Sequence, residues 1–239
     1  MSAASNRRAV ADIAELQNSL YRDGGILYHA NEETMFQGYA CIFGPEGTPY
    51  MDCPMLYEVT VPTTFPFDPP QVQFRTYDGH TRFHPNMYIG GKCCLSILHT
   101  WQGPKWASTM RLSTVLVTLQ SLMDSDPLRH EPGYEKQRDE LARCYKVAVE
   151  VGCTRWILER AESLAAGKTQ PSVFEPFIEE FQKRLPATLD RLEVRLRTCS
   201  EGGEKVWPRI LDLIEGSSGY AVSLQRVLKL KAALNTGSK

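Results

Sequence analysis

Hydrophobic side chains recur along this chain with two different periods. In residues 5–21 they return every three or four positions, which predicts an amphipathic helix at the N-terminal end. Aromatic and β-branched residues then dominate 28–43, 55–62 and 72–76, and Gly-Pro or Pro signals bound these runs. Consecutive strands joined by short turns predict an antiparallel meander.

The middle of the chain predicts a long loop followed by helices. Residues 77–110 hold several glycines and prolines and show no regular period. A loop of this length is uncommon in a compact domain unless it carries function. The helical period returns in 113–123, and 134–165 predicts one long helix or two shorter ones.

The last third of the chain predicts further helices. Aromatic and aliphatic residues recur every three or four positions across 174–196, and we expect Pro186 to kink or break that helix. Residues 200–203 are typical of a linker. A last helix is expected from about Trp207, with a break at 216–219.

Length and local composition predict the domain organisation. A chain of 239 residues can bury a substantial core. The glycine, proline and polar residues of 167–171 indicate a boundary. We therefore expect one domain in 1–167 and a helical extension in 168–239.

Charge and cysteine content narrow the function classes. The 27 basic and 28 acidic residues give a net charge of −1, which is not a nucleic-acid-binding balance. No apolar stretch reaches the length of a membrane span, and the N-terminus lacks a signal-peptide core. Seven cysteines without a secretion signal predict free thiols in a reducing compartment, hence a cytoplasmic or nuclear protein.

The candidate chemistry lies inside the long loop. The tripeptide His84-Pro85-Asn86 precedes Cys94 so that the carboxamide of Asn86 and the thiol lie eight residues apart, with Gly90 and Gly91 between them. A thiol can hold an acyl group as a thioester. A neighbouring carboxamide can stabilise the oxyanion that forms when a second nucleophile removes that group.

This arrangement resembles the active site of ubiquitin-conjugating enzymes. Further similarity lies in 44–50, in 57–74 and around Trp106, so that the resemblance covers roughly residues 5 to 160. It implies an α+β fold of the UBC type, with an N-terminal helix, a four-stranded antiparallel meander, an active-site loop and then helices. The extension would add an all-α segment.

The resemblance also implies the reaction and its partners. The enzyme would accept ubiquitin, or a ubiquitin-like modifier, from an activating enzyme and pass it to a substrate lysine or a ligase cysteine. A RING- or HECT-type ligase is an expected partner. The chain itself would need no cofactor or metal, because the activating enzyme uses the ATP. Segments 101–106 and 130–135 and the helical tail resemble the large family members that pair with the alternative activating enzyme.

Residue roles follow from the same comparison. Cys94 would carry the thioester, and Asn86 would support the oxyanion and the loop. His84 would be structural. His130 and Glu131 fall near the place where the family has an acidic residue beside the attacking lysine.

Binding surfaces are implied as well. Arg7 and Arg8 lie at the start of the first helix, where the family binds the activating enzyme. Phe67 matches a loop aromatic that contacts RING-type ligases. Ala107 and Ser108 lie where Ser-Pro-Ala is common, and the proline is missing here.

Three other interpretations compete with this one. A catalytically silent variant of the same fold would bind ubiquitin or a partner without reaction, although such variants lack the cysteine. A general-base His84 beside Cys94 would suggest a cysteine hydrolase. Zinc binding is weakly supported, because the nearby cysteines, Cys93 and Cys94, are adjacent and form no Cys-x-x-C pair.

Overall fold

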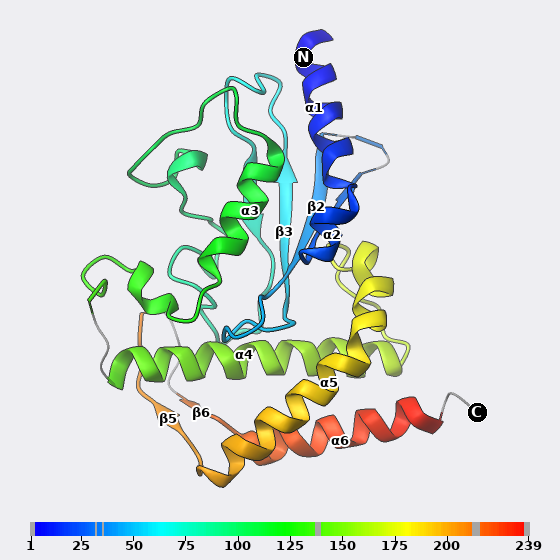
Figure 1. The fold of residues 1–239 in the computed structure, drawn as a ribbon, viewed down its shortest axis with the longest axis vertical. Coiled ribbons are helices and arrows are strands. Elements are labelled where there is room, and N and C mark those ends of the chain that lie inside the picture. Colours follow the sequence, from blue (N-terminus) through cyan, green and yellow to red (C-terminus); the bar gives the residue numbers. More distant parts are fainter. Residues whose placement is uncertain (1–2, 32, 35, 137–139, 212–215, 237–239) are drawn as a thin grey trace.

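The computed structural model describes residues 3–31, 33–34, 36–136, 140–211 and 216–236. Its first half is a four-stranded antiparallel sheet in the order β1-β2-β3-β4, with helices packed on one face (Figure 1). This confirms the predicted α+β meander. The elements of this half are α1 Ala3–Leu16, α2 Ser19–Asp23, β1 Ile26–Ala30, β2 Gln37–Phe43, β3 Pro54–Thr60, β4 Gln71–Phe74 and α3 Leu112–Leu122.

Two predicted elements are each divided. The helix expected over 5–21 is α1 followed by the short α2, whose N-terminus is capped by the Asn18 side chain. The run 28–43 contains most of β1 and all of β2, which pair with each other. The chain reverses at Asn31, whose side chain accepts the backbone N–H of Glu33 at 2.8 Å. This Asx turn divides the segment 28–43, which the hydrophobic pattern alone predicts as one continuous strand.

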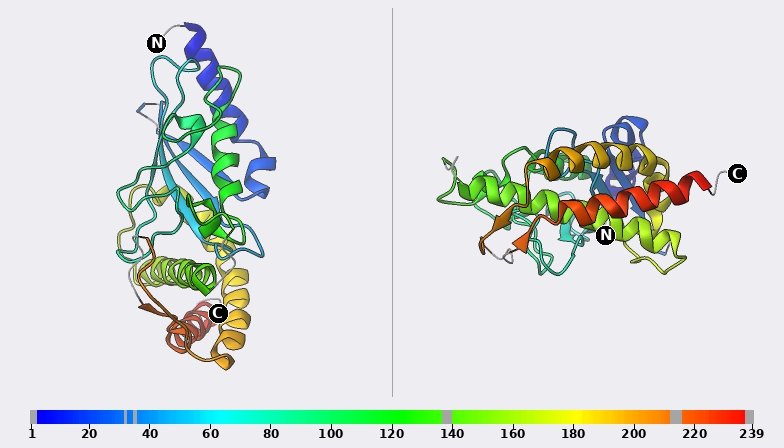
Figure 2. Two further views of the ribbon diagram at one scale, coloured as in Figure 1. Left: turned by 90° about the vertical axis from the view of Figure 1, so that its left-hand side faces the viewer. Right: turned by 90° about the horizontal axis from the view of Figure 1, so that it is seen from below.

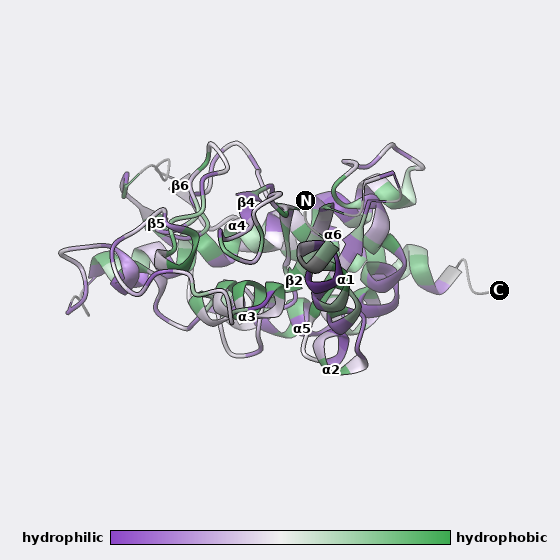
Figure 3. Ribbon diagram, turned by 90° about the horizontal axis from the view of Figure 1, so that it is seen from above, coloured by the Kyte–Doolittle hydropathy of each residue, from purple (hydrophilic) through white to green (hydrophobic). Residues whose placement is uncertain are grey.

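One face of the sheet forms the main core against α1 and α3. Tyr28, Ile42 and Tyr57 lie on this face, and all three are buried. Alternation along a strand places their neighbours on the opposite face. Figure 3 shows that hydrophobic residues predominate in α3, and Leu116 and Leu119 of this helix are buried.

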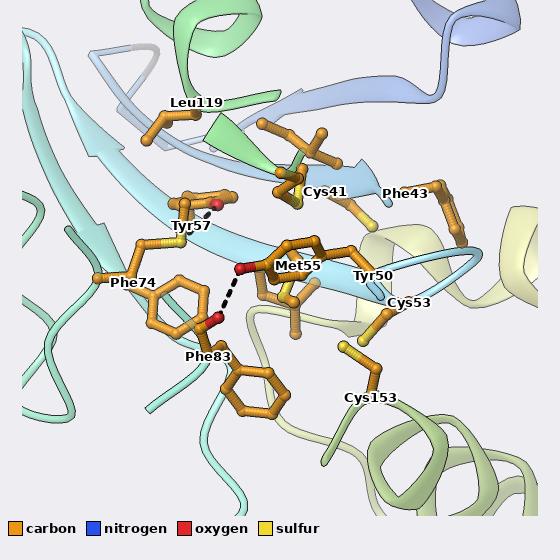
Figure 4. Packing of buried hydrophobic residues seen from close by; sticks show 14 of the residues in the cluster. Cys41, Phe43, Tyr50, Cys53, Met55, Tyr57, Phe74, Phe83, Leu119 and Cys153 are labelled. Carbon is orange, nitrogen blue, oxygen red and sulfur yellow. Dashed lines mark hydrogen bonds between the residues drawn. The ribbon is translucent and has the colours of Figure 1, made fainter. Parts of the chain in front are cut away.

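The opposite face of the sheet is covered in part by the C-terminal segment. Cys41, Phe43 and Leu56 lie on this face and are buried. The guanidinium of Arg184 lies over the Phe43 ring at 4.5 Å and donates to the carbonyl of Arg22 at 3.2 Å. The aromatic and aliphatic stripe of the extension therefore packs, and its side chains join the same core (Figure 4 shows part of it).

Helix α4, Glu140–Ala165, runs across one end of the sheet (Figure 1). It is one continuous helix within the range 134–165, and residues 137–139 lie outside the described residues. Gly152 lets α4 approach the loop closely, since a Cβ there would lie 2.5 Å from Oγ1 of Thr81. Arg155 of α4 adds an ion pair of 3.0 Å with Asp78.

Helices α5, Ile178–Glu201, and α6, Tyr220–Thr236, extend this layer at the same end of the sheet (Figures 1 and 2). Lys231 of α6 pairs with Asp190 and Glu193 of α5, each at 2.6 Å. Arg226 of α6 pairs with Glu162 of α4 at 2.8 Å.

The expected bounds of two C-terminal helices are wrong. The expected break at Pro186 is absent: this residue lies inside α5, and Leu185 and Leu189 are buried on either side of it and hold both turns in the core. The last helix begins at Tyr220 rather than near Trp207. Trp207 instead lies in β5, Val206–Trp207, which pairs with β6, Gly216–Ser217, so the extension is helical apart from this short pair. No helix among the described residues has the length and apolarity needed to cross a membrane.

Candidate active site

The loop of residues 77–110 is fixed to the core on both sides of the His-Pro-Asn tripeptide. Phe83 and Met87 are fully buried. The hydroxyl of Tyr50 donates to the carbonyl of Phe83 at 2.7 Å, and the hydroxyl of Tyr57 donates to Sδ of Met87 at 3.3 Å (Figure 4). These tyrosines come from the sheet region, so the sheet itself positions the three residues between Phe83 and Met87.

Asn86 and Cys94 are joined by two reciprocal hydrogen bonds. The backbone N–H of Cys94 donates to the carbonyl of Asn86 at 2.8 Å, and Nδ2 of Asn86 donates to the carbonyl of Cys94 at 2.7 Å. The two predicted catalytic residues are therefore brought together. Cys94 is only 2% exposed.

The turn between them depends on Gly91. This residue adopts a φ of +89°, a conformation that favours glycine. Its carbonyl accepts the N–H of Phe74 at 2.7 Å, which attaches the turn to the end of β4.

His84 supports the loop from a fully buried position. Its Nδ1 accepts the N–H of Asn86 at 3.0 Å. Burial lowers the pKa of His84 well below its ordinary value of 6.5, and the neighbouring His130 ring adds to the shift. The ring is therefore neutral at physiological pH, and its unprotonated Nδ1 is free to accept. The ring thus makes a hydrogen bond within the loop itself.

The adjacent cysteines lie in different environments. Cys93 belongs to the buried apolar cluster, whereas Cys94 does not. Burial raises the pKa of the Cys93 thiol to about 12. Cys93 therefore fills space in the core, and its thiol is not prepared for nucleophilic attack.

Thr100 is a site residue that the sequence did not indicate. Its hydroxyl accepts the N–H of Leu95 at 2.9 Å and donates to the carbonyl of Cys93 at 2.6 Å. The backbone is thus held on both sides of Cys94. The contact depends on a turn at His99, which has a left-handed φ of 59°, and no spacing rule reveals such a turn.

His130 and Glu131 lie beside the tripeptide, although more than forty residues separate them in sequence. The 3₁₀ helix η2, Pro127–His130, places the His130 ring 4.9 Å from the His84 ring, centroid to centroid. Nε2 of His130 lies 3.0 Å from a carboxylate oxygen of Asp124. Glu131 turns toward Arg82, with 3.9 Å between its carboxylate and the guanidinium.

An open groove of about 650 Å³ lies next to the cysteines. Three segments line it: the proline-rich loop with the start of β4, the glycine turn, and the residues that follow the cysteines. They contribute residues from 62–73, 90–93 and 98–100. Cys93 lines the groove, and Cys94 follows it directly in the same loop.

The predicted docking residues gather at one end of the sheet. Phe67 is 76% exposed, and Ala107 and Ser108 are exposed as well. Nε1 of Trp106 donates to the carbonyl of Pro66 at 2.7 Å, which joins their two loops.

The two arginines of α1 differ in their surroundings. Arg7 is exposed. Arg8 donates to the carbonyl of Ser108 at 3.0 Å and to that of Met110, and it pairs with Asp12 at 2.8 Å. Arg8 therefore joins α1 to the loop that carries Ala107 and Ser108.

Comparison with known proteins agrees with this geometry. A model of the family described as ubiquitin-conjugating enzyme matches residues 9–150. Ubiquitin-conjugating enzyme E2 Z of Xenopus tropicalis is 41% identical over 123 residues, which cover 50% of this chain and 39% of that protein. The dual E2 ubiquitin-conjugating enzyme/E3 ubiquitin-protein ligase BIRC6 of Homo sapiens is 39% identical over 145 residues, covering 57% of this chain and 3% of that protein.

Solved structures give the same answer. The ubiquitin-conjugating enzyme Pex4p of H. polymorpha, in complex with the soluble domain of Pex22p, is similar with a TM-score of 0.52 and 25% identity. The match covers 64% of this chain and 98% of Pex4p. The chain spans only 35% to 39% of the length of the E2 Z relatives.

The family match covers more than half of the chain and includes the sheet, the His-Pro-Asn tripeptide and Cys94. The chain belongs to the ubiquitin-conjugating enzyme family.

Proposed function

We propose that this chain is an active ubiquitin-conjugating enzyme that carries ubiquitin, or a ubiquitin-like modifier, as a thioester on Cys94. The observation that supports this most directly is the reciprocal pair of hydrogen bonds between Asn86 and Cys94. A catalytically silent member of the fold would need neither the Asn86 carboxamide nor the Cys94 thiol, so the presence of both favours catalysis.

The reaction has two acyl transfers. In the first, the Cys94 thiol gives its proton to solvent, its sulfur attacks the carbonyl carbon of the activating enzyme's ubiquitin thioester, and the activating enzyme's thiolate leaves. In the second, a lysine amine attacks the Cys94 thioester, the C–S bond breaks, and the amine proton passes to solvent or a nearby base. Each transfer develops an oxyanion, which a fixed amide donor stabilises.

Asn86 would serve both the loop and the oxyanion. One N–H of its carboxamide is used by the Cys94 carbonyl. A carboxamide nitrogen carries two hydrogens, so the second remains to stabilise the oxyanion. His130 and Glu131 lie on the adjacent segment, where they are candidates to orient the incoming lysine.

Partner binding is proposed for the end of the sheet that carries α1. Arg7 offers an exposed cation for the activating enzyme, and Arg8 shapes the same surface through Ser108. Phe67 with Ala107 and Ser108 offers an exposed surface to a ligase. Pairing with the alternative activating enzyme is proposed from the family resemblance of the extension.

A cytoplasmic or nuclear location is proposed from the thiols. All seven cysteines are free in the structure. A reducing compartment keeps such thiols, and Cys94 among them, available for thioester formation.

Charging on Cys94 tests the function. Incubation with either activating enzyme, ATP and ubiquitin should add one ubiquitin that dithiothreitol removes. The Cys94→Ser variant should give an adduct that resists dithiothreitol, and Cys93→Ala should charge as the wild type does. Charging of Cys94→Ala together with loss in Cys93→Ala would overturn the assignment.

A further inference from the structure

Arg82 is a buried cation two residues before the His-Pro-Asn tripeptide. Its side chain is 5% exposed. A buried charge is costly unless it is paired and hydrogen-bonded. The partners of the guanidinium include the carbonyl of Pro85 at 2.6 Å, the ring of Tyr88 at 4.1 Å and the carboxylate of Glu131 at 3.9 Å.

The Pro85 contact acts on the peptide unit that leads into Asn86. The carbonyl of this unit accepts from Arg82, and its N–H, on Asn86, donates to Nδ1 of His84 at 3.0 Å. A peptide unit is planar, so holding both polar ends fixes its orientation. That orientation sets where the Asn86 side chain starts, and hence whether it reaches the Cys94 carbonyl.

Arg82 is itself held by elements outside the loop. The hydroxyl of Tyr145 in α4 donates to the backbone carbonyl of Arg82 at 2.8 Å. Glu131 directly follows η2 and approaches the guanidinium of Arg82. Arg82 therefore connects α4 and the segment of Glu131 to the peptide before Asn86.

We infer that Arg82 is a positioning residue for ubiquitin transfer, acting through the Pro85–Asn86 peptide on the Asn86 carboxamide. This inference rests on the proposed function. A misplacement of about 1 Å in a catalytic arrangement can cost about a hundred-fold in rate. We therefore expect loss of the guanidinium to slow discharge of the Cys94 thioester by roughly ten- to a hundred-fold.

A single-turnover experiment measures this loss. The chain is charged with ubiquitin, the activating enzyme is stopped, and free lysine is added while the thioester is followed. Arg82→Met should reach wild-type charging amplitude but discharge more slowly by the factor above. Arg82→Lys should recover part of the rate, because it keeps a cationic donor for Pro85 and a charge for Glu131 but loses the planar stack on Tyr88.

Arg155→Met provides the matched control. It also removes an arginine that ties this loop to α4, through the ion pair with Asp78, but it does not touch the peptide before Asn86. Discharge by this variant should proceed at the wild-type rate. If Arg155→Met slows discharge as much as Arg82→Met does, the effect is a general loosening of the loop and the inference is wrong.

A second measurement does not depend on activity. In ¹⁵N-labelled protein, the side-chain amide signals of Asn86 should shift and broaden in Arg82→Met and stay unchanged in Arg155→Met. Unmoved Asn86 signals in Arg82→Met overturn the inference. A wild-type chain that no activating enzyme can charge refutes the proposed function instead, and the amide signals still decide the positioning role. If Arg82→Met does not fold, the discharge rate and the Asn86 amide signals are measured in Arg82→Lys instead. Slower discharge together with shifted signals is then the expected result.

Discussion

The Arg184 guanidinium of α5 lies 4.5 Å from the centre of the Phe43 ring on β2. These residues belong to the two regions on either side of the expected boundary at 167–171. Arg191 of the same helix pairs with Asp52 at 2.7 Å, in the turn between β2 and β3. The extension therefore shares a core with the sheet. Residues 167–171 are a domain boundary only if the parts on either side of them unfold in separate transitions.

Phe181→Ala should destabilise the whole chain. Phe181 is buried and packs edge-on against Phe174 at 5.3 Å. Large-to-small changes of this kind cost about 3–5 kcal/mol. Chemical denaturation followed by both fluorescence and circular dichroism should show one shifted transition. Two separate transitions, with only one shifted, would mean that residues 1–167 fold independently of the extension.

Asn86→Ala should affect discharge more than charging, because the activating enzyme also contributes to the oxyanion's surroundings during charging and is absent during discharge. The variant loses the donor to the Cys94 carbonyl and, with it, the donor proposed for the oxyanion. Loss of one oxyanion donor costs about a hundred- to a thousand-fold in rate. The measurement compares single-turnover discharge to free lysine with the rate of thioester formation. Equal losses in both steps would indicate that Asn86 acts only by folding the loop.

The stability of the loop should fall in mild acid. The pKa of His84 in the folded state is lowered below 6.5. At a pH just below 6.5 the unfolded chain therefore protonates this ring while the native chain keeps it neutral. The contribution of the neutral His84 ring to the free energy of unfolding is complete above about pH 6.5. It is lost as the pH falls from that value toward the pKa of the folded state. His84→Asn has no titrating ring, so the difference in unfolding free energy between it and the wild type should change between pH 7 and about pH 5. A constant difference would show that His84 carries no linkage.

Gly152→Ala should destabilise the chain by overpacking. The new methyl group would lie 2.5 Å from Oγ1 and 2.7 Å from Cγ2 of Thr81. Overpacking of this kind costs about 1–3 kcal/mol. Thr81→Ala in the same chain should recover part of the loss, which a double-mutant cycle of unfolding free energies will show. Gly90→Ala is the control, because its added methyl group meets no atom within 4 Å.

Much of the fold could be predicted because its signals are local. The period of α1, the aromatic strands and the spacing of Asn86 and Cys94 all lie within short segments. The hydrophobic pattern alone does not show the hairpin at Asn31, because a side-chain turn, and not a change in hydrophobicity, reverses the chain there. The fourth strand is expected only from the family resemblance. Pro186 does not break α5, because burial of Leu185 and Leu189 outweighs its local preference.

Two residues that hold the backbone of the site could not be predicted. Thr100 and Arg82 act through hydrogen bonds to backbone carbonyls, and backbone carbonyls leave no trace in a sequence. Tyr145 reaches Arg82 from 63 residues away. The contact between Tyr145 and Arg82 forms only when α4 packs against the loop, so it depends on the tertiary structure.

The helical layer of α4, α5 and α6 and the loops of Phe67 and Ser108 lie at opposite ends of the sheet (Figure 1). A protein that contacts only the helices and another that contacts only the loops would bind separate surfaces of this chain. Their binding free energies should therefore add, unless one of them deforms the strands or α4 between them. If the affinity for one partner changes when the other is bound, the sheet or α4 must have changed shape. The ratio of the two affinities would give the coupling free energy.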